Sequence, residues 1–262
     1  RFGKPPWNKS YSVGGQSGYS PATPNQTMLS SVCRFDMDND TALATPRANK
    51  TWGSSDAFFG SSQNHGYYMK GRRYNNDSVP SPNYHFYVED LGSSAYEKLD
   101  YSNDTAQMTT VYDYWAGGTQ QWCSGVSAST NDWTWMHGGL RWFTEDDTAT
   151  SNFNRFSHAN DSLSLLGSGW QRAYATATND GEHMYIIGGY SGTAGQPSYS
   201  MVIRYDLWSD TTDSSSDMNI TPGGSKHTMA FGTPNYGYVM SGLFYGSPYN
   251  PKGVGNTIVY RL

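Results

Sequence analysis

The chain has 262 residues and a formal net charge of −5, and it is only 15% charged but 15% aromatic. Aromatic side chains at this frequency exclude intrinsic disorder, because disordered chains lack the groups that form a core. The acidic balance argues against a basic surface for nucleic acid or an anionic membrane, and no run of 18 apolar residues predicts a membrane span. We therefore expect a folded globular protein.

Short hydrophobic segments that end in glycine recur along the chain. They are 11–15 (YSVGG), 67–71 (YYMKG), 133–139 (WTWMHGG), 184–189 (MYIIGG) and 238–242 (YVMSG). Their spacing of about 50 to 70 residues indicates a repeat architecture, and about 50 residues is typical of four-stranded propeller blades. We predict one β-strand in each segment.

Two further strands are predicted around each glycine strand. The first precedes it and ends in Asn, which suits the turn between the two strands. These segments are 57–64, 126–131, 173–179 and 229–235, with 1–8 as a clipped copy. The second follows the glycine and combines a basic or aromatic residue with Asp or Ser. These segments are 33–36, 154–157 and 203–206, with weaker counterparts at 86–90 and 258–262.

In these three elements the chain resembles the kelch family, although the second repeat has Lys70-Gly71 in place of Gly-Gly. The resemblance implies an all-β fold, a single five-bladed β-propeller with four-stranded antiparallel blades. The repeats would lie near 1–52, 53–121, 122–169, 170–224 and 225–262. An open fragment of a larger ring is the alternative. The resemblance also implies tryptophans packed between blades, at Trp52, Trp122, Trp170 and Trp208.

The last predicted blade lacks its outer strand, because the sequence ends within the third strand. An unpaired strand edge is a template for another strand. The edge would be covered by residues 1–9, covered by a neighbouring molecule, or left open.

The motifs of common catalytic sites are missing from the sequence, including the phosphate loop, the nucleophile elbow and the zinc-binding helix. We predict no catalytic residue, no metal and no cofactor. Two enzyme classes remain as alternatives. Resemblance to copper radical oxidases implies a Tyr-Cys crosslink and two His ligands, for which Cys123, His137 and His183 are candidates.

A glycosidase, the other alternative, needs two carboxylates about 5 to 10 Å apart. The acidic residues lie mostly in turn-like strings, where capping and solvation explain them. Examples are Asp38, Asp40, Glu145, Asp147 and Asp210.

Eight Asn residues have Ser or Thr two positions later without an intervening Pro, which is the acceptor pattern for N-glycosylation. They are Asn8, Asn25, Asn39, Asn49, Asn76, Asn103, Asn160 and Asn219. Glycosylation of several would place the protein outside a eukaryotic cell. The alternative is that the triplets only form turns, as they would in a viral surface propeller. The first residue, Arg1, is not Met, which fits a processed mature chain.

Cys33 and Cys123 are compatible with one disulfide in an oxidising compartment or with two buried thiols in a reducing one. The loops after the glycine strands combine aromatic and Arg residues with Gly, Ser and Pro, and we expect them to share one propeller face. These predicted binding-face residues are Tyr19, Arg72, Arg73, Tyr74, Arg141, Trp142, Phe143, Tyr190, Tyr199, Phe244, Tyr245 and Tyr249. The alternative is that these rings pack onto their own blades.

The sequence thus predicts a secreted, glycosylated structural or interaction module, located extracellularly and not acting as an enzyme. A sharper hypothesis is head-to-tail self-assembly into a fibril or coat, with the missing strand supplied between molecules. Its partners would be itself or another extracellular protein, and it would carry N-linked glycans. The alternatives are a carbohydrate-binding lectin that uses the aromatic loops, or one of the two enzyme classes.

Overall fold

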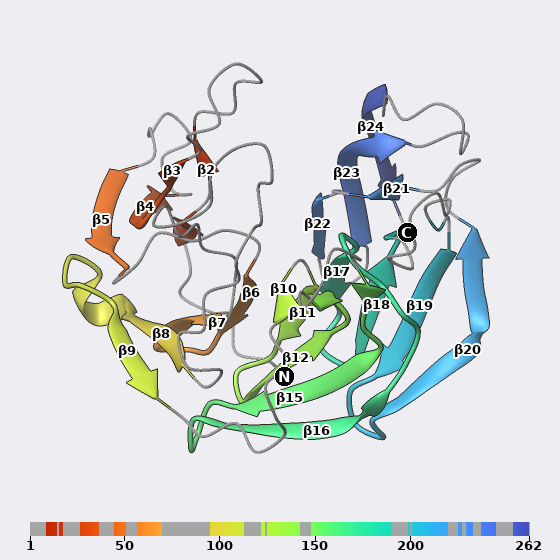
Figure 1. The fold of residues 1–262 in the computed structure, drawn as a ribbon, viewed down its shortest axis with the longest axis horizontal. Helices are drawn as coiled ribbons and strands as arrows, with labels where there is room; N and C mark the ends of the chain where they lie inside the picture. Colours follow the sequence, from red (N-terminus) through yellow and green to blue (C-terminus); the bar gives the residue numbers. More distant parts are fainter. Residues whose placement is uncertain are drawn as a thin grey trace, which may run out of the picture. The chain divides into compact units, whose positions relative to one another are not determined.

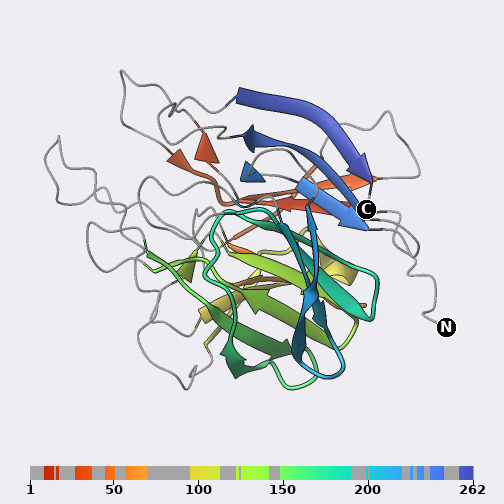
Figure 2. The ribbon, with the colours of Figure 1, turned by 90° about the vertical axis from the view of Figure 1, so that its right-hand side faces the viewer.

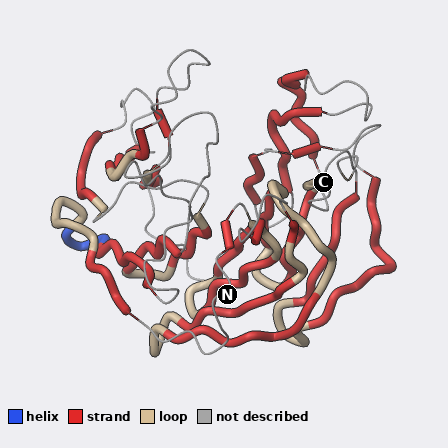
Figure 3. The backbone as a smooth tube through the Cα atoms, viewed as in Figure 1, coloured by secondary structure: helices blue, strands red, loops and turns tan. Residues whose placement is uncertain are grey.

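The computed structural model is built from β-strands in the part of the chain that it describes (Figures 1 and 3). That part comprises residues 9–14, 16–17, 27–36, 45–50, 57–69, 95–112, 122–123, 125–141, 148–189, 199, 201–219, 225–226, 229–232, 237–244 and 254–261. Within these ranges the helical structure is a single 3-10 turn, η2 (Tyr101–Asn103). The chain divides into two compact units, Arg1–Tyr114 and Trp115–Leu262.

Unit 1 (Arg1–Tyr114) contains a three-stranded and a four-stranded antiparallel sheet. The first has the order β1 (Lys9–Val13), β4 (Ser31–Asp36) and β5 (Thr45–Asn49). The second has β6 (Phe58–Ser61), β7 (His65–Met69), β8 (Ala95–Asp100) and β9 (Thr109–Tyr112) in sequence order. A short pair is formed by β2 (Gln16–Ser17) and β3 (Thr27–Met28). The core of this unit is Val32, Ala48, Ala57, Tyr68, Leu99 and Met108.

Unit 2 (Trp115–Leu262) contains two complete four-stranded sheets in sequence order. One consists of β11 (Val126–Ser129), β12 (Trp133–His137), β15 (Asn152–Ser157) and β16 (Ser162–Ser168). The other consists of β17 (Thr176–Asn179), β18 (His183–Ile187), β19 (Met201–Asp206) and β20 (Thr211–Asn219). A further small sheet is built around β13 (Leu140–Arg141), which follows β12 in the chain. This strand pairs with both β10 (Trp122–Cys123) and β14 (Thr148–Ala149).

The last sheet of unit 2 is built around β23 (Gly237–Phe244). This strand pairs with β21 (Ser225–Lys226), β22 (Met229–Gly232) and β24 (Val254–Arg261), as Figure 2 shows for β23 and β24. Among the described residues, no strand pairs with the other side of β24. Strand β17 lies against β11 of one neighbouring sheet and β22 of the other (Figure 1).

Burial alternates from residue to residue along the first strands of two of these sheets. β6 has the pattern buried, exposed, buried, exposed, and β11 alternates buried and half-buried residues. The two faces of such a strand therefore differ in exposure, as the period of two requires. The hairpin turns between first and second strands use polar residues. In one of them the carboxylate of Asp180 accepts hydrogen bonds from the amides of Glu182 and His183, at 2.8 and 2.7 Å.

All five predicted glycine strands are strands in the structure, at β1, β7, β12, β18 and β23. The preceding strands are also confirmed, at β6, β11, β17 and β22, and so are three of the following strands, at β4, β15 and β19. The predicted position of the third strand in the second repeat was wrong. Its third strand is β8 (Ala95–Asp100), which pairs with β7, whereas segment 86–90 lies outside the described residues. In the register of this pair Lys98 faces Tyr67.

The sheets share an aromatic residue opposite a basic residue at one register position. In the five sheets these pairs are Tyr11 and Arg34, Tyr67 and Lys98, Trp135 and Arg155, Tyr185 and Arg204, and Tyr238 and Arg261. The constant position indicates that the repeats share one register as well as one strand order.

In two of these pairs, an Asp from the sheet that follows in the sequence accepts hydrogen bonds from both residues. We call this contact a clasp. Asp104, in the turn between β8 and β9, accepts hydrogen bonds from the Tyr11 hydroxyl at 2.9 Å and from Arg34 at 2.8 Å. Asp210, in the turn between β19 and β20, accepts from Arg155 at 2.9 Å and from the Trp135 indole at 3.4 Å. The same clasp therefore joins neighbouring sheets within each unit.

The Asp104 clasp is the more deeply buried of the two. Burial raises the pKa of Asp104, but the hydrogen bonds from Tyr11 and Arg34 and the Arg34 charge lower it more, so its pKa lies below the ordinary value of 3.8. The same contact acts in the opposite direction on its partner: burial and the Asp104 carboxylate raise the pKa of Tyr11 to about 12. Both groups thus keep the protonation state that the clasp needs around neutral pH.

We expect Asp104→Asn to lower the free energy of unfolding by about 2 kcal/mol, because it leaves Arg34 without its anionic partner. Asp210→Asn should cost about 1 kcal/mol, since its ion pair is more exposed. Urea denaturation measures both, with the exposed Asp132→Asn as the control. Because the folded pKa of Asp104 is depressed, its contribution is present above pH 4 and disappears as the pH falls through the folded pKa. Equal acid sensitivity of wild type and Asp104→Asn would contradict this assignment.

Candidate functional site

The loop between β16 and β17, residues 169–175, crosses directly over the Gly-Gly ends of β12 and β18. A Cβ atom on Gly138 would overlap the carbonyl oxygen of Arg172, and one on Gly189 would lie 2.8 Å from the Ala175 Cβ. Both glycines also have positive φ, 66° and 86°. Only glycine combines this backbone conformation with so close a contact, so the Gly-Gly motif determines where the loop lies.

Arg172 fastens the loop to both Gly-Gly motifs. Its carbonyl accepts a hydrogen bond from the Gly139 amide at 2.6 Å, and its guanidinium donates to the Gly188 carbonyl. The residue is 1% exposed. The guanidinium also lies 4.3 Å from the centre of the Tyr199 ring, in a cation–π arrangement. A buried cation therefore connects the loop to the ring of Tyr199.

Tyr199, two residues before β19, is held to the same framework. The Tyr199 amide donates to the Gly189 carbonyl at 2.7 Å, while the Gly169 amide donates to the Ser151 carbonyl at 2.6 Å. Tyr174, in the 169–175 loop, has a positive φ of 52°, which is uncommon for a residue other than glycine. The backbone on both sides of the site is thus tied to the strands beneath it.

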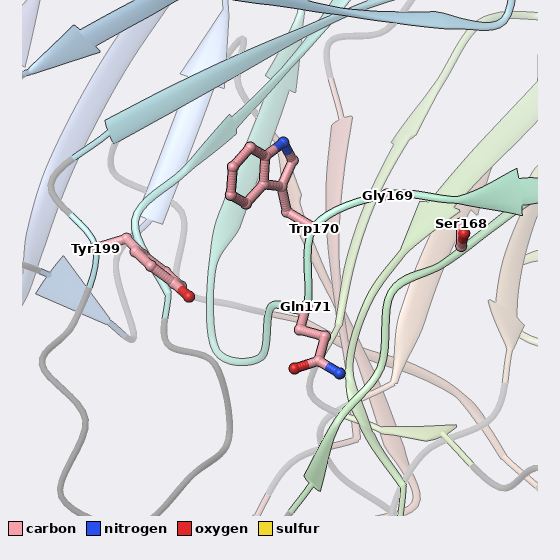
Figure 4. A pocket seen from close by; sticks show the side chains of 5 residues that line it. All are labelled: Ser168, Gly169, Trp170, Gln171 and Tyr199. Carbon is pink, nitrogen blue, oxygen red and sulfur yellow. The ribbon is translucent and has the colours of Figure 1, made fainter.

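The end of β16, the 169–175 loop and Tyr199 form an open groove of about 450 Å³. Its lining consists of Ser168, Gly169, Trp170, Gln171 and Tyr199. Figure 4 shows the Trp170 and Gln171 side chains extending in different directions from one loop, with Tyr199 on a separate segment. Trp170 is unusually exposed for so large a side chain, because 47% of the residue is accessible to solvent. The groove therefore offers an aromatic surface beside neutral hydrogen-bonding groups.

A buried imidazole lies below this groove. His137 is 2% exposed, packs edge-on against Phe153, and places Nε2 3.2 Å from where a Cβ of Gly169 would be. Among the described residues, its Nδ1 has no hydrogen-bond partner. Burial, with the nearby Arg172 charge, lowers the pKa of His137 to about 3. His137 is therefore neutral around neutral pH and supports the groove floor from below.

The groove chemistry suits noncovalent binding. None of the described lining residues carries a carboxylate, an imidazole or a thiol. No group of three or more His, Cys, Asp or Glu side chains in the described ranges is placed to hold a metal ion. Aromatic rings, hydroxyl groups and an amide can stack on and hydrogen-bond to a ligand.

Of the predicted binding-face residues, Tyr199 lines the groove. Arg141 and Phe244 are on β13 and β23, but their side chains lie outside the described part of the chain. The same holds entirely for Tyr19, Arg72, Arg73, Tyr74, Trp142, Phe143, Tyr190, Tyr245 and Tyr249.

Sequence reasoning missed Trp170 and Gln171 as site residues. Trp170 was expected between blades, as was Trp208, and both expectations were wrong: the two residues are 47% and 77% exposed. Trp52 and the side chain of Trp122 lie outside the described residues. The available signal was a Trp-Gln pair placed just before the buried Arg172, in the loop that enters a repeat.

Three predicted acceptor sites are exposed in the structure: Asn49, Asn103 and Asn160. The Asn160 side chain accepts a hydrogen bond from the Ser162 hydroxyl at 2.8 Å, and Asn103 accepts one from Thr105 at 3.3 Å. These triplets therefore also serve as turns. Asn219 ends β20, with its side chain outside the described residues, as are Asn8, Asn25, Asn39 and Asn76 entirely.

The candidate enzyme residues that the structure describes do not lie together in one site. His137 is buried under the groove, whereas His183 begins β18 with Nδ1 3.2 Å from the Asp180 carboxylate. Asp210, expected to be a solvated turn residue, instead clasps Arg155. Cys33 has a free, half-buried thiol. The Cys123 side chain, together with Asp38, Asp40, Glu145 and Asp147, lies outside the described residues.

We expect acid to destabilise the fold through His137. Its folded pKa of about 3 lies below the ordinary value of 6.5, so the unfolded chain binds more protons between these two values. The free energy of unfolding should therefore fall as the pH decreases from 6.5 to 4.5, a range above the titration of Asp104. His137→Leu should flatten that decrease in urea titrations at successive pH values. An unchanged slope in the variant would contradict a buried neutral His137.

Comparisons with known proteins identify the repeat. The kelch motif family matches residues 171–211, which run from the loop of Gln171 through β17, β18 and β19. No match was found among curated protein sequences. No helix in the described residues is long and apolar enough to span a membrane.

Solved structures agree on the fold. One similar structure is that of YjhT, a kelch-type propeller, with a TM-score of 0.67 and 12% sequence identity. The similarity covers 88% of this chain and 75% of that one. Because the identity is low, the likeness concerns the fold alone. The chain thus contains a kelch motif and has an all-β fold of four-stranded antiparallel sheets resembling a kelch-type propeller.

Proposed function

We propose that the protein is a recognition module that binds its ligand noncovalently in the groove of Ser168, Gly169, Trp170, Gln171 and Tyr199. The observation that carries this proposal is the half-exposed Trp170 in an open groove of about 450 Å³. A large aromatic side chain left in solvent on a fixed loop is typical of a contact surface, because Trp contributes much binding area with little loss of conformational entropy.

The setting of the groove supports this proposal. The 169–175 loop is anchored through Arg172 to two Gly-Gly motifs, so binding would not have to order this loop first. Loops on a rigid scaffold commonly carry binding sites.

Kelch propellers include both interaction modules and enzymes, so the chemistry of the groove has to decide between them. The described lining offers aromatic, amide and hydroxyl groups and no carboxylate pair for a glycosidase. The copper oxidase alternative required His137 as a ligand, yet this imidazole is 2% exposed beneath Gly169. Recognition without catalysis is therefore the function that this groove favours.

Binding and catalysis can be compared directly on the full chain. We expect wild type to retain ligands from a peptide display library or a glycan array, and Trp170→Ala to lose them. Neither protein should hydrolyse a panel of aryl glycosides or oxidise sugar alcohols in the presence of copper. Trp208→Ala is the control. Trp208 is also a tryptophan and is 77% exposed, but it follows the C-terminal end of β19, whereas Tyr199 of the groove precedes the N-terminal end. Turnover by wild type, or binding indifferent to Trp170→Ala, would contradict the proposal.

We also propose that this module is extracellular and N-glycosylated. The accessible positions of Asn49, Asn103 and Asn160 support this setting, since an acceptor Asn must be reachable from solvent. The low proportion of charged residues fits a surface on which glycans provide solubility. The fibril hypothesis stays a prediction, because its donor segment, residues 1–9, is described only at Lys9 in β1.

Intact mass of the native protein tests glycosylation. We expect a mass above the 29.0 kDa of the sequence, reduced by enzymatic removal of N-glycans, with occupancy mapped to Asn49, Asn103 or Asn160. Asn103→Gln and Asn160→Gln should remove the corresponding increments. A native mass equal to that of the bare chain would leave the triplets as turns and remove the support for an extracellular location.

A further inference from the structure

We propose that the ligand of the Trp170 groove is a neutral pyranose sugar, held with one face on the Trp170 indole. This inference rests on the recognition function proposed above and names its ligand class. Four features of the groove carry it: the exposed indole, the fixed Tyr199 ring, the neutral polar groups and the open shape.

The first feature is the indole itself. Trp170 is 47% exposed although it is flanked by Gly169, whose amide bonds to Ser151, and Gln171, which precedes the buried Arg172. The loop backbone is therefore held while the ring projects from it. One face of a pyranose displays C–H groups, which pack on the electron-rich face of an aromatic ring. A half-exposed ring on a fixed backbone suits such a ligand.

The second feature is Tyr199. Its ring is stacked against the Arg172 guanidinium at 4.3 Å, and its amide is bonded to Gly189. The cation below holds the ring in place before any ligand arrives, which lowers the entropic cost of binding. The phenol hydroxyl adds one donor and acceptor at the edge of the groove.

The third feature is charge. The groove places the Gln171 amide and the Ser168 hydroxyl beside the two rings, so both donors and acceptors are available for sugar hydroxyls. The nearby cation, Arg172, is 1% exposed and covered by Tyr199, and no described lining residue is charged. An acidic sugar would find no accessible counter-charge among these residues, so the groove favours a neutral one.

The fourth feature is the shape. A volume of about 450 Å³ lies within the range of small-molecule sites, roughly 300 to 1,000 Å³. The groove is open rather than enclosed. A single sugar ring can therefore stack on Trp170 while neighbouring sugars of a longer chain extend into solvent.

The test uses the full chain after removal of its own N-glycans, so that these cannot compete for the groove. A glycan array first selects the best neutral hexose. Isothermal titration or sugar-induced changes in tryptophan fluorescence then measure its affinity as the methyl glycoside, with methyl glucuronide as the acidic comparator. We expect a dissociation constant in the range of about 0.1 to 10 mM for a single ring. The glucuronide should bind at least about tenfold more weakly, because its carboxylate must be desolvated without a partner.

The variants identify the site. Trp170→Ala should weaken sugar binding by about tenfold or more, whereas Trp170→Phe should retain part of it. Trp208→Ala should leave the affinity within about twofold, since this exposed Trp follows the opposite end of β19 from Tyr199. Circular dichroism and urea denaturation show whether each variant is folded, and the Phe variant keeps the test informative if the Ala variant is not.

Three outcomes would overturn the inference. They are no binding of neutral glycosides at about 10 mM, tighter binding of the acidic comparator, and sugar binding unchanged in both folded Trp170 variants. Peptide binding that depends on Trp170, in the absence of sugar binding, would overturn the sugar assignment while supporting the recognition function. Dependence on Trp170 for neither class would contradict both.

Discussion

The close contact between the 169–175 loop and the Gly-Gly ends of β12 and β18 is the constraint on which the described part of unit 2 depends. A side chain at Gly138 would overlap the carbonyl of Arg172, and one at Gly189 would meet Ala175. Because both positions are glycine, Arg172 can bond to Gly139 and Gly188 together. The two sheets and the loop between them are thus fixed by one buried residue.

The same arrangement links packing to the groove. Arg172 is buried for structural reasons, yet its guanidinium lies against Tyr199 and its neighbour Gln171 lies in the groove with Trp170. His137 fills the space below Gly169 as a neutral ring. At the turns between third and fourth strands, Asp104 and Asp210 join successive sheets. The contacts that hold these sheets together therefore lie in the strands, in the 169–175 loop and in these turns.

Much of the fold could be predicted because each repeat has a short local signature. A hydrophobic segment ending in Gly-Gly, preceded by a strand that ends in Asn, is recognisable from sequence alone, and every such segment is a strand. The prediction failed at the third strand of the second repeat, where β8 begins at Ala95 rather than near residue 86. The interval between the second and third strands is longer in this repeat than in the others, and segment 86–90 within it has an aromatic-acidic pattern like that of the third strands.

The sequence by itself determined the repeat, its strand order and the position of the close-contact glycines, because these depend on local hydrophobic period and on backbone freedom. Of the binding-face residues that it predicted, Tyr199 lines the groove. Tertiary structure alone decided that Trp170 faces solvent, that Arg172 is buried beneath Tyr199 and that Asp210 clasps Arg155 in the preceding sheet. These features depend on residues brought together across loops and sheets, and no spacing along the chain encodes those distances.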